Sequence, residues 1–264
     1  MPYQAITYQT ADRVGIITLN RPEVGNAINI QLAMEMANVC SQINHDQGVS
    51  VVTITGAGEV FSVGTDWGSL SAISGGELQT QAPWGREKEL WSVATAVSKL
   101  SCPVIAAING DALGQGLELA LACDCRIAAE TARLGLPQIS SNHSPWDGGT
   151  QRLPRLVGRA KAMEMILLGE PISAREAYRL GLVNKVIQPE ELSSFVPDMA
   201  RRIASNAPLA LRYAKEAVHK GLDLTLEQGL HLETDLYMLL QTTEDRTEGI
   251  TSFLQKRQSN FKGR

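Results

Sequence analysis

The sequence predicts an α/β fold in which buried strands alternate with helices, followed by a helical tail. Between residues 14 and 129, short apolar runs typical of buried strands alternate with segments of helical periodicity. Turn-forming residues close the first strands, at Asn20-Arg-Pro22 and at Gly56-Ala-Gly58. Beyond Gly158 nearly every pattern is helical. Strands that alternate with helices favour a sheet connected by crossovers rather than by hairpins.

Helices separate the strands expected in the first part of the chain. The first helix is expected from about Ile30, because Met36, Ala37, Cys40 and Ile43 recur at helical spacing. Residues 68–86 are rich in Gly, Ser, Gln and Pro and predict a long loop. The expected strands are Val14–Asn20, Val49–Thr55, Pro103–Asn109 and Asp124–Ala129, and the other expected helices are Leu90–Leu100 and Leu117–Cys123.

The tail contains several signals for the start of a helix. Ser173-Ala-Arg-Glu176 and Thr225-Leu-Glu-Gln228 have the pattern of capping boxes, in which the first side chain accepts a hydrogen bond from the fourth residue. Pro208 suits the first turn of another helix. We therefore expect a core of residues 1–196 and a separate helical region of residues 197–264.

Composition excludes several classes of function. The chain has 264 residues and a formal net charge of −4, which argues against a nucleic-acid surface. Its apolar runs are far shorter than the roughly 20 residues that span a membrane. The N-terminus lacks the pattern of a signal peptide, so a cytoplasmic location is expected. Neither the four cysteines nor the four histidines have metal-ligand spacing, so no metal is expected.

Three glycine-containing segments are candidates for chemistry, namely Phe61–Asp66, Asn109–Glu118 and Pro145–Leu153. Glycine lets the backbone approach a ligand closely. The first N–H groups of a following helix have no partner inside the helix, and they suit a phosphate or a developing oxyanion. The alternative is that these segments are only tight turns between strand and helix. Neither GxGxxG nor GxxxxGK[ST] is present, which excludes the dinucleotide and P-loop motifs.

Glu118 is the one acidic residue of the apolar helix expected at Leu117–Cys123. Burial of a carboxylate is costly unless it is paired, and it raises the pKa from about 4.3 toward neutrality. A carboxyl group of this kind can both accept and donate a proton. The alternative is a structural ion pair with an arginine or lysine elsewhere in the chain.

At these segments the sequence resembles the crotonase superfamily, also called the enoyl-CoA hydratase/isomerase family. The resemblance covers nearly the whole chain. It is carried by Ile16–Pro22, Asn26-Ala27, Phe61–Asp66, Cys102–Gly110, Ala112–Asp124, Gly148–Leu153, Ser173–Val183, Phe253–Arg257 and Phe261.

The resemblance implies a crotonase-like spiral of ββα units with a C-terminal helical region that forms trimers, or hexamers as dimers of trimers. It implies an acyl-CoA substrate whose thioester carbonyl is held by the backbone N–H groups of Thr65 and Gln115. Coenzyme A would enter as part of the substrate, with no resident cofactor. The implied substrate-binding and coenzyme A-binding residues are Val63, Gly64, Asp66, Trp67, Gly114, Trp146, Lys256 and Phe261.

The departures from the family pattern concern the acid/base residues. Glu118 matches one of the two glutamates of the hydratases, but Gln138 stands where the second would follow Pro137. Glutamine can hold a water but cannot exchange a proton at neutral pH. Asp147 replaces a small residue and is a candidate for the missing carboxylate. The alternative role for Asp147 is the N-cap of the helix that follows.

The leading prediction is a hydro-lyase that adds water to the 2,3 double bond of an enoyl-CoA or removes it, with Glu118 assisted by Asp147 or Gln138. A double-bond isomerase, which needs one carboxylate, is an alternative. A third is a hydrolase or C–C lyase of a cyclic oxoacyl-CoA, with a larger role for His143. A non-enzymatic scaffold that binds CoA esters is a fourth. Trp67, Trp84 and Trp146 hint at a wide acyl pocket.

Overall fold

The computed structural model describes residues 3–69 and 91–264. The loop expected at residues 68–86 therefore lies almost wholly outside the described residues. Trp84 and the first residue of the helix expected at Leu90–Leu100 lie outside them as well.

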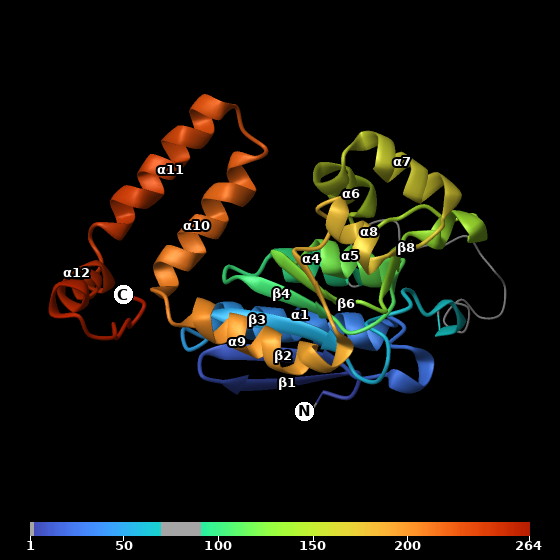
Figure 1. Ribbon diagram of the computed structural model, residues 1–264, viewed down its shortest axis with the longest axis horizontal. Helices are drawn as coiled ribbons and strands as arrows, with labels where there is room; N and C mark the ends of the chain where they lie inside the picture. Colours follow the sequence, from blue (N-terminus) through green and yellow to red (C-terminus); the bar gives the residue numbers. More distant parts are fainter. Residues whose placement is uncertain (1–2, 70–90) are drawn as a thin grey trace.

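A mixed sheet of six strands forms the centre of the molecule, in the order β1-β2-β3-β4-β6-β9 (Figure 1). β1 is antiparallel to β2, and all other neighbours are parallel. The four strands predicted from the sequence correspond to β2, β3, β4 and β6. The strands are β1 (Ile6–Ala11), β2 (Val14–Leu19), β3 (Val51–Gly56), β4 (Val104–Ile108), β6 (Cys125–Ala129) and β9 (Lys185–Ile187).

Two strands of this sheet were not predicted. β1 and β2 form a hairpin, so the expectation of crossovers alone is wrong at this edge. β1 is an edge strand that exposes most of its side chains, so it has no apolar run. The turn is formed by Asp12 and Arg13, which have φ angles of 50° and 65°. β9 lies in the part of the chain expected to be helical, and with three residues it is too short to show a period.

Helices cover both faces of the sheet. Side chains of one face, including Val52 and Ile54, pack in a core with α1, α4 and α5. Those of the other face, including Val51 and Ile105, pack against α9. This alternation follows from the period of two along a strand. The helices are α1 (Ile30–His45), α4 (Val93–Ser98), α5 (Gln115–Leu121), α6 (Gly149–Val157), α7 (Arg159–Leu168), α8 (Ala174–Arg179) and α9 (Leu192–Ala204).

A smaller sheet connects the core to α6–α8. Its strands are β5 (Ala112–Leu113), β7 (Arg133–Gly135) and β8 (Ile172–Ser173), in that order. The Ser173 side chain caps α8 by accepting a hydrogen bond from the Glu176 N–H, as its sequence pattern predicts. The result is a mixed α/β core followed by a helical region, which confirms the predicted fold class.

The tail consists of α10 (Pro208–Gly221), α11 (Leu226–Leu240) and α12 (Glu244–Gln255). Figure 1 shows α10 and α11 side by side and projecting from the sheet, with α12 at the lower end of α11 on the left. The predicted capping box at Thr225 and Gln228 is confirmed. The boundary expected between residues 196 and 197 stays a prediction, and it falls inside α9, which packs on the sheet. None of the helices in the described part of the chain combines the length and apolar character needed to cross a membrane.

Candidate active site

Two of the three glycine-containing segments lie side by side. Ser62 pairs with Ala112 in an isolated parallel bridge, which brings residues 61–66 against the segment that leads into α5. Gly64 has a φ angle of +98°, and a Cβ atom there would stand 2.8 Å from the Leu113 carbonyl oxygen and 3.2 Å from the Gln115 nitrogen. Only glycine permits both this conformation and this approach.

The main-chain N–H groups of Thr65 and Gln115 are available for a ligand. Ile28 bonds to both neighbours of Thr65: its N–H donates to the Gly64 carbonyl at 2.7 Å, and its carbonyl accepts from the Asp66 N–H at 2.9 Å. In a parallel bridge the intervening N–H points to the opposite side. Gln115 is the first residue of α5, where the N–H has no partner in the helix. Within residues 3–69 and 91–264, neither N–H has an acceptor.

Glu118 is fully buried on the first turn of α5. Its Oε1 accepts hydrogen bonds from the N–H groups of Asp147 and Gly149, both at 2.8 Å. Burial, with the charge of Asp147, raises its pKa to about 7, although the two N–H groups oppose the shift. No arginine or lysine in the described chain forms a salt bridge with Glu118, so the ion-pair alternative is not supported. A carboxyl group with this pKa can gain and lose a proton at neutral pH.

Gln138 lies against Glu118, in the short 3₁₀ helix Pro137–Ser141. Its Nε2 donates to the Glu118 Oε2 at 3.1 Å. Its Oε1 is buried without a hydrogen-bond partner. A buried acceptor without a partner is costly, so this oxygen is available for a water or a hydroxyl group. A Cβ atom on Gly114 would stand 3.6 Å from Nε2, which puts the amide next to the start of α5.

Asp147 does not cap the helix that follows it, so the N-cap interpretation is wrong. Gly148 occupies the N-cap of α6, with no side-chain hydrogen bond. The buried Asp147 carboxylate instead accepts from the Ser92 hydroxyl, from the Ala94 N–H at 3.0 Å and from the Gln115 Nε2 at 3.2 Å. Burial raises its pKa, and these hydrogen bonds oppose that shift. The Asp147 carboxylate thus faces α4 and Gln115, while its N–H faces Glu118.

An aromatic contact joins Trp67, which directly follows the first segment, to His143, two residues before the third segment. The ring centroids of Trp67 and His143 lie 4.2 Å apart. Arg21, which was not singled out in the sequence, forms an ion pair with Asp66 at 2.9 Å. Burial by itself raises the pKa of Asp66, but the hydrogen bonds from Ser69 and Arg21 outweigh it and lower the pKa.

Several residues near the site were predicted from the resemblance, and others were not. Val63 and Trp67 are exposed, and Trp146 is half-buried. Val63 and Trp146 lie on the first and third segments, and Trp67 directly follows the first. Trp91 and Ser92 were missed, because a main-chain carbonyl and a lone serine leave no signal in a sequence.

The structure does not bring Lys256 and Phe261 to Glu118 within one chain. Lys256 is the exposed C-cap of α12, and Phe261 packs against Gly249 of the same helix. In Figure 1, α12 lies beyond α10 and α11, whereas α5 and α6 lie over the sheet.

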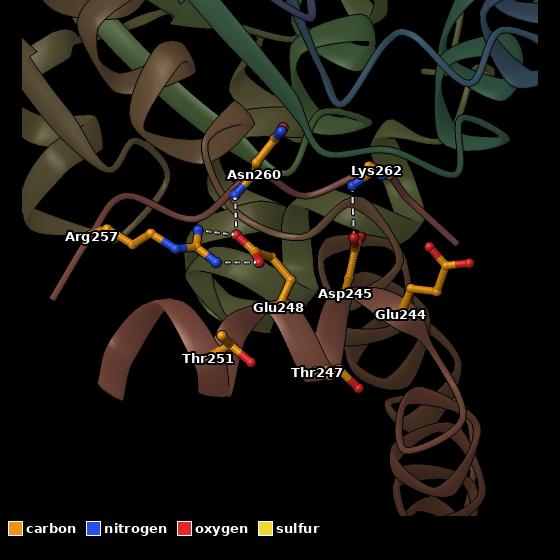
Figure 2. A pocket seen from close by; sticks show the side chains of 8 residues that line it. All are labelled: Glu244, Asp245, Thr247, Glu248, Thr251, Arg257, Asn260 and Lys262. Atoms are coloured by element: carbon orange, nitrogen blue, oxygen red, sulfur yellow. Dashed lines mark hydrogen bonds and ion pairs between the residues drawn. The ribbon is translucent and has the colours of Figure 1, made fainter. Parts of the chain in front are cut away.

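A pocket of about 520 Å³ lies between α12 and the terminal segment (Figure 2). The Glu248 carboxylate pairs with Arg257 across it, and the Asp245 carboxylate accepts the Lys262 N–H at 2.7 Å. These bonds fold the terminal segment onto α12, and the pocket is separate from the Glu118 site. Its lining residues are Glu244, Asp245, Thr247, Glu248, Thr251, Arg257, Asn260 and Lys262.

Known proteins resemble this chain over nearly its full length. Residues 9–264 match the sequence model of a family described as enoyl-CoA hydratase/isomerase. The chain is 38% identical over 262 residues to a crotonyl-CoA hydratase of Syntrophomonas wolfei, with 99% of each chain covered. It is 42% identical over 252 residues to a 2,3-dehydroadipyl-CoA hydratase of Escherichia coli, with 96% of each covered. The crystal structure of an enoyl-CoA hydratase from Bacillus anthracis superposes with a TM-score of 0.89 at 41% identity, covering 99% of this chain and 100% of that one.

Proposed function

Because the chain belongs to the enoyl-CoA hydratase/isomerase family, we propose that it is a hydratase that adds water across the 2,3 double bond of an enoyl-CoA and removes it in reverse. The chain is an enzyme of this type, and an acyl-CoA thioester is its substrate. The observation that carries the proposal is a buried carboxyl group, with its pKa raised to about 7, on the same helix turn as an amide that has no acceptor.

The thioester oxygen binds to the N–H groups of Thr65 and Gln115. Addition of water to C3 moves the electrons of the double bond toward the thioester, and negative charge develops on that oxygen. Donors that are already oriented stabilise this charge without reorganising during the reaction. Each such donor is worth roughly 3 kcal/mol of barrier.

Glu118 moves the proton. The ionised carboxylate accepts a proton from water as the water oxygen bonds to C3. The resulting carboxylic acid then donates this proton to C2 of the enolate, which restores the carboxylate and completes the 3-hydroxyacyl-CoA. One carboxyl group is sufficient for this cycle, because it ends in the state in which it began. A pKa near the working pH makes both transfers favourable.

Gln138 supports both states of Glu118. Its unpartnered Oε1 is an acceptor for the attacking water, while its Nε2 donates to the ionised Glu118. When Glu118 is protonated, rotation of the amide offers Oε1 to the new O–H group. Gln138 therefore holds and orients groups without exchanging a proton.

The second candidate is a double-bond isomerase of enoyl-CoA. Gln138 contacts Glu118 where a second carboxyl group would otherwise stand, and isomerisation needs only one carboxylate to move a proton between C2 and C4. Turnover in water enriched in ¹⁸O separates the two reactions. A hydratase incorporates the label into the 3-hydroxyacyl product, whereas an isomerase incorporates none.

The proposal includes a homo-oligomer that completes the coenzyme A site. α11 and α12 expose large apolar side chains, among them Leu226 and Phe253, at 80% and 83%. Exposed apolar surface of this size marks an interaction site. In a trimer, Lys256 and Phe261 would reach the coenzyme A bound to a neighbouring subunit, which accounts for their distance from Glu118 in one chain.

The substitution Glu118→Gln tests the assignment. It keeps the shape of the side chain and removes its capacity to exchange a proton. We expect kcat to fall by about 10²- to 10⁴-fold, with the Kd of a saturated acyl-CoA nearly unchanged. Glu170→Gln, at an exposed carboxylate, is the matched control and keeps wild-type turnover. Wild-type turnover in Glu118→Gln would exclude this mechanism.

A further inference from the structure

The side chain of Gln115 connects the two segments that carry the unpartnered amides. Gln115 is fully buried. Its Oε1 accepts a hydrogen bond from the Thr65 hydroxyl at 3.0 Å. Its Nε2 donates to the Trp91 carbonyl at 2.7 Å and to the Asp147 Oδ2 at 3.2 Å. The same two residues whose main-chain N–H groups would bind the thioester oxygen are thus joined by their side chains.

The orientation of this amide follows from its neighbours. A carbonyl and a carboxylate can only accept hydrogen bonds, so the nitrogen of the Gln115 side chain must face Trp91 and Asp147. Its oxygen then faces Thr65, whose hydroxyl can donate. Both donors of the amide nitrogen are engaged. No other rotation of the amide satisfies all three partners.

We propose that Gln115 is a positioning residue, whose side chain, held by Asp147 and Trp91, fixes the Thr65 segment so that both thioester-binding amides keep their separation. This inference rests on the proposed function. It assigns a role to the Asp147 carboxylate that involves no proton transfer. The Asp147 side chain orients Gln115, and the Asp147 N–H holds the Glu118 carboxylate.

We call the hydrogen bonds of the Gln115 side chain to Thr65, Asp147 and Trp91 the brace. The brace matters because of the backbone that precedes the two amides. Each amide directly follows a glycine with a positive φ angle. Gly64 (98°) precedes Thr65, and Gly114 (53°) precedes Gln115. Main-chain hydrogen bonds hold both glycines, Gly64 through Ile28 and Gly114 through Gly135, but neither glycine has a side chain that restrains its dihedral angles. Stabilisation of the oxyanion depends on donors at fixed positions. The hydrogen bond between the Thr65 and Gln115 side chains adds a restraint between the two segments, one residue after each glycine.

Paired substitutions test the brace. Thr65→Val keeps the shape of the side chain and removes the hydroxyl, and Gln115→Ala removes the amide. We expect each to lower kcat about 10-fold, the factor for one lost hydrogen bond, with the KM for an enoyl-CoA changed much less. Because both remove the same contact, the double variant is expected to be no slower than Gln115→Ala alone. Thr65→Ser returns the donor and should recover most of the lost kcat.

Matched controls lie on the exposed edge strand. Gln9→Ala and Thr10→Val change the same residue types on β1 and should leave kcat at the wild-type value. Thr65→Val is the milder variant and keeps the test valid if Gln115→Ala does not fold. Multiplicative losses of kcat in the double variant, or no recovery in Thr65→Ser, would overturn the brace.

An infrared measurement separates this inference from the proposed function. A saturated acyl-CoA labelled with ¹³C at the thioester carbonyl binds without reacting. Hydrogen bonds from both amides should lower its carbonyl stretching frequency in the wild-type protein, and lower it less in Thr65→Val. If no enoyl-CoA is hydrated but the frequency depends on the Thr65 hydroxyl, the hydratase proposal fails and the brace stands. If enoyl-CoA is hydrated and Thr65→Val matches the wild type in frequency and kcat, the brace alone fails.

Discussion

At the scale of single residues, Glu118 stands out because its environment is buried and polar at once. Burial favours its neutral form, whereas two main-chain N–H groups and the Gln138 amide favour the ionised form. The balance gives a pKa of about 7. A carboxyl group at the surface would titrate far below neutrality and could not return a proton efficiently.

The pH dependence of turnover should report this group. The cycle begins with the ionised carboxylate, so kcat/KM for hydration is expected to rise with pH and reach a plateau above about pH 7. The equilibrium constant for hydration does not depend on pH, so kcat/KM for dehydration must follow the same curve. Initial rates in both directions between pH 5 and pH 9, in buffers of constant ionic strength, check this. A profile that falls between pH 6 and pH 8 would contradict it.

The same carboxyl group should lower the stability of the fold at neutral pH. Its folded-state pKa of about 7 lies above the ordinary value of 4.5, so the folded state disfavours the ionised form. There is no penalty below pH 4.5, it grows between pH 4.5 and pH 7, and it is constant above. A shift of this size corresponds to roughly 3 kcal/mol.

Glu118→Gln removes this penalty, and rotation of the Gln138 amide supplies its new N–H group with an acceptor. We therefore expect the variant to have a higher Tm than the wild type at pH 8. The difference should shrink as the pH falls and vanish near pH 4.5. Thermal unfolding followed by circular dichroism at several pH values measures this. A Tm difference that is independent of pH would show that the pKa of Glu118 is not raised.

At the scale of elements, the site depends on the close approach of two backbones. Gly64→Ala would place a Cβ atom 2.8 Å from the Leu113 carbonyl oxygen, at a φ angle of +98°. We expect the variant to lose more than about 1 kcal/mol of stability and most of its kcat, because the Thr65 amide must move. Gly221→Ala is the control, since a Cβ atom there meets nothing within 4 Å. Equal Tm and kcat for both variants would contradict the packing argument.

The sequence predicted best those elements whose own side chains form an apolar pattern, either a stripe along a helix or an unbroken run. α1 has a buried stripe, and β2, β3, β4 and β6 are apolar runs, so their patterns are visible locally. β1 and β9 are defined by backbone pairing with a neighbouring strand. Backbone hydrogen bonds are the same for every residue type, so such pairing leaves little trace in the sequence.

At the scale of the whole molecule, the helical tail exposes large apolar side chains. Phe253 and Leu254 of α12 are 83% and 74% exposed. We expect the wild-type protein to form trimers or hexamers, and the double substitution Phe253→Asp with Leu254→Asp to dissociate them, because charges at an apolar interface are not compensated. Light scattering after size-exclusion chromatography measures the mass. Gln255→Asp, at an exposed polar position of the same helix, is the control.

The assembly also affects catalysis if the tail completes a neighbouring site. The dissociated variant should then show a higher KM for an enoyl-CoA, and Lys256→Ala should raise KM with little change in kcat. A wild-type protein that runs as a monomer with full activity would contradict both expectations.

The sequence by itself determined the fold class and singled out Glu118 as a buried carboxyl group. Helical spacing predicts α1 and α4, apolar runs predict the inner strands, and a lone acid in an apolar helix predicts a carboxyl group with a raised pKa. Only the tertiary structure decided what Asp147 does, since its carboxylate contacts Ser92 and Gln115, 55 and 32 residues away in the chain. The pattern of apolar and polar residues in a sequence indicates which side of an element is buried. It does not record the direction of one polar side chain, because that is set by donors from distant segments.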